Sequence, residues 1–202
     1  MDNFYALMAR MKNISRWALM RSVMPENVQE HSHMVAVLAH ALAVIRRDVY
    51  GVPCDPNAAA AAALFHDASE ILTGDLPTPI KYNNPEIMAA YRQVEAAASE
   101  KLLDMLPAEL RPAYEPLLQD PDAGTRALVK AADKLSAYIK CIEERRAGND
   151  EFRQAERKSL ETLRGYGMPE VDYFLEHFIP AFDRTLDELG TMDYREPVKP
   201  GT

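Results

Sequence analysis

Residues 58–70 have the sequence AAAAAALFHDASE, and this stretch decides the fold expected for the chain. Alanine is the strongest helix former, so its six-residue run predicts a helix, which we place at about residues 56–72. Residues three and four apart share one face of a helix. His66, Asp67 and Glu70 are therefore expected to point into one pocket beside a buried segment of small residues.

The same helical spacing of apolar residues recurs in almost every other segment. No run of alternating apolar and polar residues bounded by hairpin turns stands out, so the predicted fold is all-α. Residues 73–84, TGDLPTPIKYNN, are rich in Gly, Pro and Asn and are expected to form a loop at the mouth of the pocket. The remaining helices are predicted at about residues 4–12, 27–49, 85–106, 107–118, 125–147, 151–165 and 169–189.

The composition suits one helical domain and limits its partners. A chain of 202 residues with 48% hydrophobic content can bury one core, which we assign to residues 1–189. Residues 190–202 are expected to be a disordered tail. The net charge of −8 argues against a nucleic-acid polymer or a membrane surface as the main partner, because both require a basic face.

The sequence shows no targeting or membrane-spanning segment. Residues 1–12 lack the features of a secretory signal, and the longest apolar run, residues 58–65, is far shorter than the roughly 20 residues that cross a bilayer. Cys54 and Cys141 are isolated, without the spacing of a disulfide framework or a metal knuckle. These features predict a cytoplasmic protein.

Two more polar residues lie where apolar ones are expected. His31 is on the apolar face of the helix predicted at residues 27–49, and Asp133 is beside the apolar face of the helix predicted at residues 125–147. Taken alone, a histidine on such a face is more often an ordinary core residue than a ligand, and Asp133 is as well explained as a surface residue beside Lys134.

The case changes when the polar residues are taken together. His31, His66, Asp67 and Asp133 offer two imidazoles and two carboxylates, a donor set that suits one divalent cation and accepts several first-row metals. Four protein ligands leave up to two positions on a six-coordinate ion, one for a nucleophilic water and one for a phosphate oxygen. Glu70 then remains available to handle protons.

The ordered series of motifs resembles the HD-domain superfamily of metal-dependent phosphohydrolases, and within it most closely the bacterial 5′-deoxynucleotidases. The superfamily pattern is a His, a later His-Asp pair and a distant Asp, all on helices, and it is matched here by His31, His66-Asp67 and Asp133. The resemblance covers nearly the whole chain. It extends over the segments ISRWALMR (14–21), ENVQEHS (26–32), LFHDASEILTGDLPTPIKY (64–82), VKAADKLSAYIKCIEE (129–144) and VDYFLEHFIPAF (171–182).

The resemblance implies a helical bundle of about seven to eight helices, a homodimer, and one divalent cation, with cobalt or manganese favoured. It implies hydrolysis of deoxyribonucleoside 5′-monophosphates by water that attacks phosphorus. Carried over by position, it assigns metal binding to His31, His66, Asp67 and Asp133, and the two aspartates also border the substrate. Glu70 activates water, Arg16 orients the phosphate, and Trp17 crowds the sugar and disfavours a ribose 2′-hydroxyl. The residues that contact the substrate are Asp75, Leu76, Pro77 and Thr78.

Other functions remain compatible with parts of this pattern. An HD-type phosphodiesterase or a guanosine tetraphosphate hydrolase shares the fold and the metal, although the chain lacks an adjacent His-His pair for a dinuclear centre. A non-catalytic nucleotide-binding module would keep the metal for stability, but the presence of Glu70 and Arg16 argues against it. Singly, Arg16 is also explained as a surface cation and Trp17 as a core anchor.

Overall fold

The computed structural model describes residues 2–81, 84–119 and 121–190. Within these ranges every regular element is a helix, which confirms the all-α prediction, and extended pairing is limited to an isolated bridge between Ser15 and Asn27. None of the described helices is long and apolar enough to cross a membrane. Residues 191–202, most of the tail predicted to be disordered, lie outside the described ranges.

The α-helices have the following bounds: α1 Phe4–Met8, α2 Val28–Val44, α3 Pro56–Phe65, α4 Glu70–Thr73, α5 Thr78–Lys81, α6 Pro85–Leu103, α7 Arg111–Leu118, α8 Ala123–Arg146, α9 Arg153–Gly165 and α10 Pro169–His177. Short 3₁₀ segments are η1 Met11–Asn13, η3 Asp150–Phe152, η4 Ile179–Asp183 and η5 Asp187–Leu189, and a π-helical turn, η2 Ile45–Val49, extends α2. Seven of the α-helices in the described ranges have eight residues or more, as expected for the predicted bundle.

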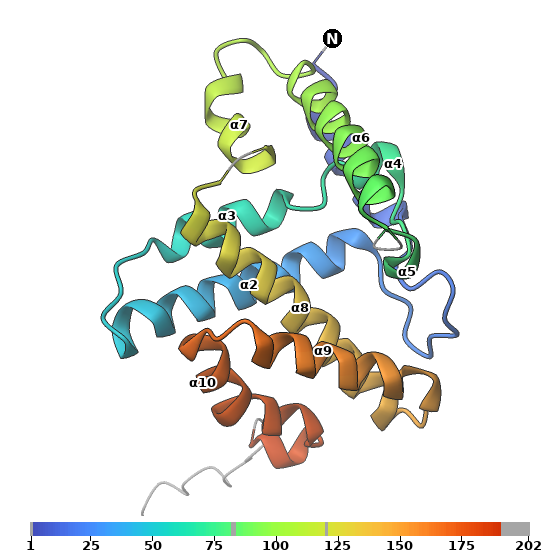
Figure 1. The fold of residues 1–202 in the computed structure, drawn as a ribbon, viewed down its shortest axis with the longest axis vertical. Helices are drawn as coiled ribbons and strands as arrows, with labels where there is room; N and C mark the ends of the chain where they lie inside the picture. The colour runs from blue at the N-terminus through green and yellow to red at the C-terminus, as the bar shows by residue number, and fades with distance from the viewer. Residues whose placement is uncertain (1, 82–83, 120, 191–202) are drawn as a thin grey trace, which may run out of the picture.

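Helices α2, α3 and α8 pack together around the main core (Figure 1). α2 begins after Asn27, whose side chain accepts a hydrogen bond from the Glu30 N–H while the Glu30 carboxylate accepts one from the Asn27 N–H. This reciprocal cap satisfies backbone donors that the first helical turn leaves unpaired. The apolar faces predicted for α2 and α8 are both buried. They comprise Val35, Leu38 and Leu42 on α2 with Ile45 at the start of η2, and Leu128, Ala132, Leu135, Ile139 and Ile142 on α8.

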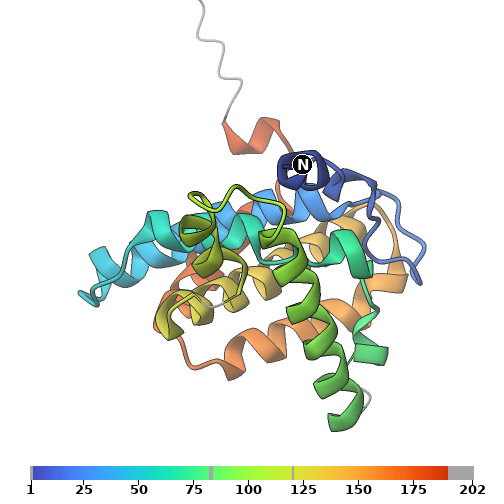
Figure 2. The same ribbon diagram turned by 90° about the horizontal axis from the view of Figure 1, so that it is seen from above.

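A second, smaller core holds α6 against the segment after α3. It contains the fully buried Ala68 together with Phe4, Leu102, Leu103 and Leu106. Figures 1 and 2 show α6 outside the bundle of α2, α3 and α8. The second core therefore fixes the chain directly after Asp67, from a different side than the main core.

The helix predicted at residues 56–72 is interrupted, and this prediction was wrong. α3 ends at Phe65, residues 66–69 form turns, and α4 begins at Glu70. The His66 Nδ1 atom lies 2.7 Å from the Ala63 carbonyl oxygen, the acceptor that the Asp67 N–H would use in a continuous helix. The following amides bond three residues back instead of four, as the Glu70 N–H does to the Asp67 carbonyl. A tight turn, rather than one helical face, brings the polar residues together.

Other predicted boundaries also differ. The α-helix predicted at residues 169–189 ends at His177, because Pro180 has no N–H to donate and its ring disfavours α-helical geometry at Ile179; the 3₁₀ segment η4 follows. The predicted loop at residues 73–84 contains the short helix α5. The helix predicted at residues 107–118 begins only at Arg111.

The fully buried Glu144 near the end of α8 holds the loop that follows Trp17. Its carboxylate accepts hydrogen bonds from the Val23 N–H at 2.8 Å and the Met24 N–H at 3.0 Å, and it is paired with Lys140. Burial opposes ionisation of Glu144, but the Lys140 ammonium and these donors outweigh it and lower its pKa to about 2. The loop is thus tied to α8 by a buried charge.

Glu144→Gln should lower the free energy of unfolding by about 3 kcal/mol at neutral pH, because it leaves the Lys140 ammonium buried without its counter-charge. A carboxylate with a depressed folded-state pKa stabilises the protein above its unfolded-state pKa and loses that contribution as the pH falls toward about 2. Urea unfolding should therefore show a smaller difference between variant and wild type at about pH 3. The exposed Glu143→Gln is the control; equal effects of the two changes would contradict the prediction.

Candidate active site

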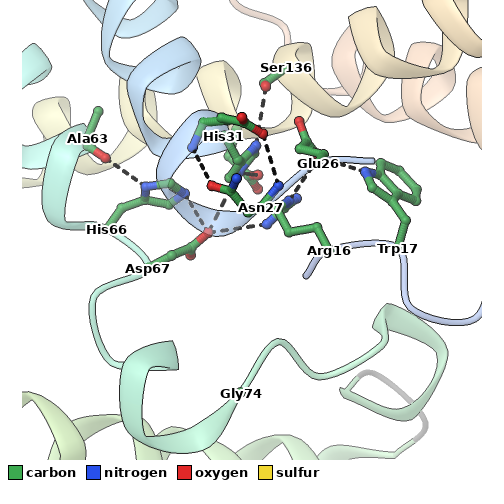
Figure 3. A network of polar contacts seen from close by, with 12 residues as sticks. Arg16, Trp17, Glu26, Asn27, His31, Ala63, His66, Asp67, Gly74 and Ser136 are labelled. Carbon is green, nitrogen blue, oxygen red and sulfur yellow. Dashed lines mark hydrogen bonds and ion pairs between the residues drawn. The ribbon is translucent and has the colours of Figure 1, made fainter. Parts of the chain in front are cut away.

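Four predicted ligands meet where α2, α8 and the turn after α3 come together. The His31 Nε2 atom lies 3.1 Å from Asp133 Oδ1 and 3.6 Å from Asp67 Oδ2, and the His66 Nε2 atom lies 3.0 Å from Asp67 Oδ2. One donor atom from each of His31, His66 and Asp133 lies within 4.8 Å of the other two, an arrangement able to hold a metal ion. Asp67 borders both imidazoles, as Figure 3 shows.

The Nδ1 atoms of both imidazoles make hydrogen bonds on the side away from the carboxylates. His66 Nδ1 contacts the Ala63 carbonyl at 2.7 Å, and His31 Nδ1 contacts the Ser136 hydroxyl at 3.2 Å (Figure 3). Because a carbonyl can only accept, His66 Nδ1 donates, so in the neutral ring Nε2 carries the lone pair. Both Nε2 atoms are buried, and neither makes a hydrogen bond within the described residues. Two buried Nε2 atoms that face two carboxylates fit a divalent cation.

The electrostatics of this cluster favour positive charge. Burial opposes ionisation of Asp67 and Asp133, but the imidazoles beside them outweigh it, so that the pKa of Asp67 falls to about 2 and the pKa of Asp133 lies below its usual range. Burial likewise opposes protonation of His66, yet Asp67 and Asp133 raise its pKa to about 9. The cluster therefore binds a proton more tightly than isolated imidazoles would, as expected of a cation site.

Glu70 is the first residue of α4 and is buried. Its Oε2 atom has no hydrogen-bond partner among the residues described. Burial, reinforced by the charges of Asp67 and Asp75, raises the pKa of Glu70 to about 9. A buried carboxyl with an unused oxygen beside a cation site is suited to proton transfer.

Arg16 lies at the edge of the cluster; its role in orienting the phosphate stays a prediction. Its Nη1 atom is 3.3 Å from Asp67 Oδ2, and its Nε atom is 3.2 Å from Glu26 Oε2. Burial opposes the charge, but Asp67, Asp133 and Glu26 outweigh it and raise the pKa of Arg16. The neighbouring Trp17 donates its indole N–H to the same Glu26 oxygen at 2.8 Å. Arg16 and Trp17 are thus adjacent in sequence and share one acceptor.

The segment predicted to contact the substrate joins α4 to α5. Gly74 has φ 74°, a conformation that side-chain-bearing residues rarely adopt, and its carbonyl accepts a long 3.5 Å hydrogen bond from Tyr91 on α6. Asp75 is half-buried, and burial together with Asp67 raises its pKa in spite of Arg16. Leu76 and Pro77 are partly buried in the same turn, and Thr78 begins α5, although its side chain lies outside the described structure. Their contact with a substrate stays a prediction.

Two residues that orient the site were not singled out from the sequence. Ser136 lies one turn after Asp133 on α8, and this i, i+3 spacing was a usable signal that both face His31. Glu26 precedes the cap of α2 inside a predicted loop. Nothing in the periodicity of that loop indicates that the Glu26 carboxylate reaches Arg16 and Trp17.

Comparison with known proteins agrees with this geometry. Residues 3–182 match the model of the YfbR-like 5′-deoxynucleotidase family. A 5′-deoxynucleotidase of Vibrio cholerae is 52% identical over 193 residues, which cover 94% of this chain and 98% of the relative. A crystal structure of an HD-domain phosphohydrolase from Listeria innocua superposes with a TM-score of 0.79 at 26% identity, covering 89% of this chain and 88% of that one. A cyanophage S-2L HD phosphohydrolase, described as bound to dA and one catalytic Zn²⁺ ion, shares the fold at a TM-score of 0.63 and 20% identity, covering 89% and 96%.

Proposed function

Because the chain belongs to the YfbR-like 5′-deoxynucleotidase family, we infer that it is a metal-dependent phosphomonoesterase that hydrolyses deoxyribonucleoside 5′-monophosphates. The observation that carries this inference is the pair of buried imidazole Nε2 atoms, without hydrogen bonds among the described residues, that face Asp67 and Asp133. Family membership also disfavours the phosphodiesterase and the non-catalytic module among the alternatives.

We propose that His31, His66, Asp67 and Asp133 hold the divalent cation. When bound, the cation orients and acidifies the attacking water and polarises a phosphate oxygen. Ser136 and the Ala63 carbonyl keep the two imidazoles turned toward it. Cobalt or manganese is the ion we propose, on the strength of the family resemblance; the mixed nitrogen and oxygen donor set accepts either.

Glu70 is the proposed base. Its Oε2 atom accepts one proton of the attacking water as the new oxygen–phosphorus bond forms and the bond from phosphorus to the 5′ oxygen breaks. The 5′ oxygen that leaves takes up one proton, supplied by Glu70 directly or through solvent, so that deoxyribonucleoside and inorganic phosphate are released and Glu70 is ionised again. Burial and the charges of Asp67 and Asp75 hold the proton on Glu70. Positive charge placed against Asp67 offsets this and lowers the pKa of Glu70 toward the range in which it accepts a proton.

Arg16 and Trp17 are the proposed recognition residues. Arg16 Nη1 lies 3.3 Å from Asp67 Oδ2, so the planar guanidinium is close enough to the cation site to donate hydrogen bonds to phosphate oxygens bound there. Trp17 follows it directly, and we propose that its indole occupies the space that a ribose 2′-hydroxyl would need. Asp75, Leu76, Pro77 and Thr78 are proposed to complete the substrate pocket.

We also propose a cytoplasmic homodimer. The free thiols of Cys54 and Cys141 and the acidic composition support a reducing, aqueous compartment. The dimer is supported by the family resemblance.

The proposal is tested by phosphate release from dAMP and AMP, using chelator-treated protein with and without added cobalt or manganese. Wild type should require the metal and prefer dAMP. Trp17→Ala should bring the dAMP-to-AMP ratio of kcat/KM down by about tenfold or more, since a steric filter of this kind is worth about 1–3 kcal/mol. Leu19→Ala, an exposed change in the same loop, should leave the ratio unaltered. No metal-dependent release from either nucleotide would refute the function; an unaltered ratio in Trp17→Ala would refute the sugar filter.

A further inference from the structure

One oxygen atom joins the two proposed recognition residues. Glu26 Oε2 accepts a hydrogen bond from Trp17 Nε1 at 2.8 Å and another from Arg16 Nε at 3.2 Å (Figure 3). The side chains of Arg16 and Glu26 are 13% and 15% exposed, so this contact is largely removed from water. A carboxylate shielded in this way holds its donors in a defined geometry more firmly than an exposed one.

The backbone places Glu26 at the start of the helix that carries His31. Ser15 and Asn27 form the isolated bridge, the Arg16 N–H donates to the Glu26 carbonyl at 3.0 Å, and Asn27 caps α2. Glu26 therefore links the loop that carries Arg16 and Trp17 to α2, the helix that carries the proposed ligand His31.

Trp17 needs such support. Its backbone φ is 59°, and within the described residues no other non-glycine residue has a positive φ. This conformation is unfavourable for a residue with a bulky side chain. The indole is held from two sides, by the hydrogen bond to Glu26 and by the Phe152 ring, whose centroid lies 5.3 Å away. Without the carboxylate, the backbone at Trp17 would be free to relax and carry the indole with it.

We propose that Glu26 is the positioning residue that sets sugar selection and phosphate binding together, by holding Trp17 over the sugar and turning the Arg16 guanidinium toward the phosphate. This inference rests on the proposed function. The contacts of Glu26 with Trp17 and with Arg16 differ in what they need from the acceptor. The indole N–H needs only an oxygen acceptor, which a glutamine supplies, whereas the guanidinium also needs the negative charge.

The test compares kcat/KM for dAMP and AMP in wild type, Glu26→Ala and Glu26→Gln. Glu26→Ala should lower the dAMP-to-AMP ratio by about tenfold, toward that of Trp17→Ala, and raise KM for both nucleotides. Glu26→Gln should keep the ratio within about twofold of wild type while kcat/KM falls equally for both substrates. A merely structural loss reduces the active fraction and cannot change this ratio. Added to Trp17→Ala, Glu26→Ala should change the ratio no further.

The capping-box variant Glu30→Ala is the matched control, because it removes a carboxylate at the same helix start without a contact to Trp17 or Arg16. An unchanged ratio in Glu26→Ala, or an equal change in Glu30→Ala, would overturn the proposal.

A second readout does not depend on turnover. Trp17 is the only tryptophan of the chain, so intrinsic fluorescence reports its surroundings directly. Acrylamide should quench Glu26→Ala more strongly than wild type and leave Glu26→Gln close to wild type. Equal quenching of all three proteins would overturn the positioning role. If wild type releases no phosphate, the proposed function fails, and quenching alone decides the role of Glu26.

Discussion

Replacing Glu70 with glutamine should lower kcat for dAMP by about 10²–10⁴-fold, the usual contribution of a general base. Glutamine has the shape of glutamate but cannot take the proton of the attacking water. Glu70 lies outside the group of proposed ligands, so the protein should still bind the cation. Initial rates at saturating metal and nucleotide measure the first quantity, and calorimetric titration with cobalt measures the second.

The matched control for Glu70→Gln is Glu86→Gln, an exposed change in the first turn of α6. It should leave both quantities unaltered. Undiminished turnover by Glu70→Gln would rule out the water-activating role, and a lost cation would move Glu70 into the ligand set.

Replacing Asp133 with asparagine should weaken cation binding by more than about 100-fold and abolish turnover at micromolar metal. The change keeps the shape of the side chain but removes the charge that lies 3.1 Å from His31 Nε2. Ser136→Ala should have a smaller effect, about 10–100-fold in affinity, because it only releases the orientation of the His31 ring. Calorimetric titration with cobalt or manganese measures these affinities, which should decrease from wild type to Ser136→Ala to Asp133→Asn.

Thermal unfolding gives an independent check of the Asp133 prediction. Ligand binding to the folded state raises Tm, so added metal should raise the Tm of wild type but not that of Asp133→Asn. Lys134→Ala, the adjacent position on α8, is the control. Equal affinity of Asp133→Asn and wild type would exclude Asp133 as a ligand.

The sequence predicted what depends on residue periodicity. The buried faces of α2 and α8 place His31 and Asp133 opposite each other, and both faces follow the helical repeat of apolar residues. The break after α3 could not be predicted in this way, because there the His66 side chain contacts the Ala63 carbonyl, which the Asp67 N–H would use in a continuous helix. The end of α10 was predictable, since Pro180 is visible in the sequence.

Glu26 illustrates what the sequence alone could not indicate. Its carboxylate reaches Trp17 only because Ser15 and Asn27 are paired across the intervening loop. Such pairing depends on tertiary contacts and leaves no periodic pattern. The resemblance implied the roles of the four proposed ligands, whereas the contact of Glu26 with Arg16 and Trp17 is visible only in the folded structure.

The turn between α3 and α4 is anchored in two hydrophobic cores. Ala63, at one end of the His-Asp turn, belongs to the main core, and Ala68, at the other end, belongs to the second core with Phe4 and Leu102. A change in the packing of either core would therefore shift one end of this turn and alter the spacing between His66 and Glu70. We therefore expect mutations in either core, far from the proposed ligands, to lower turnover in a protein that remains folded.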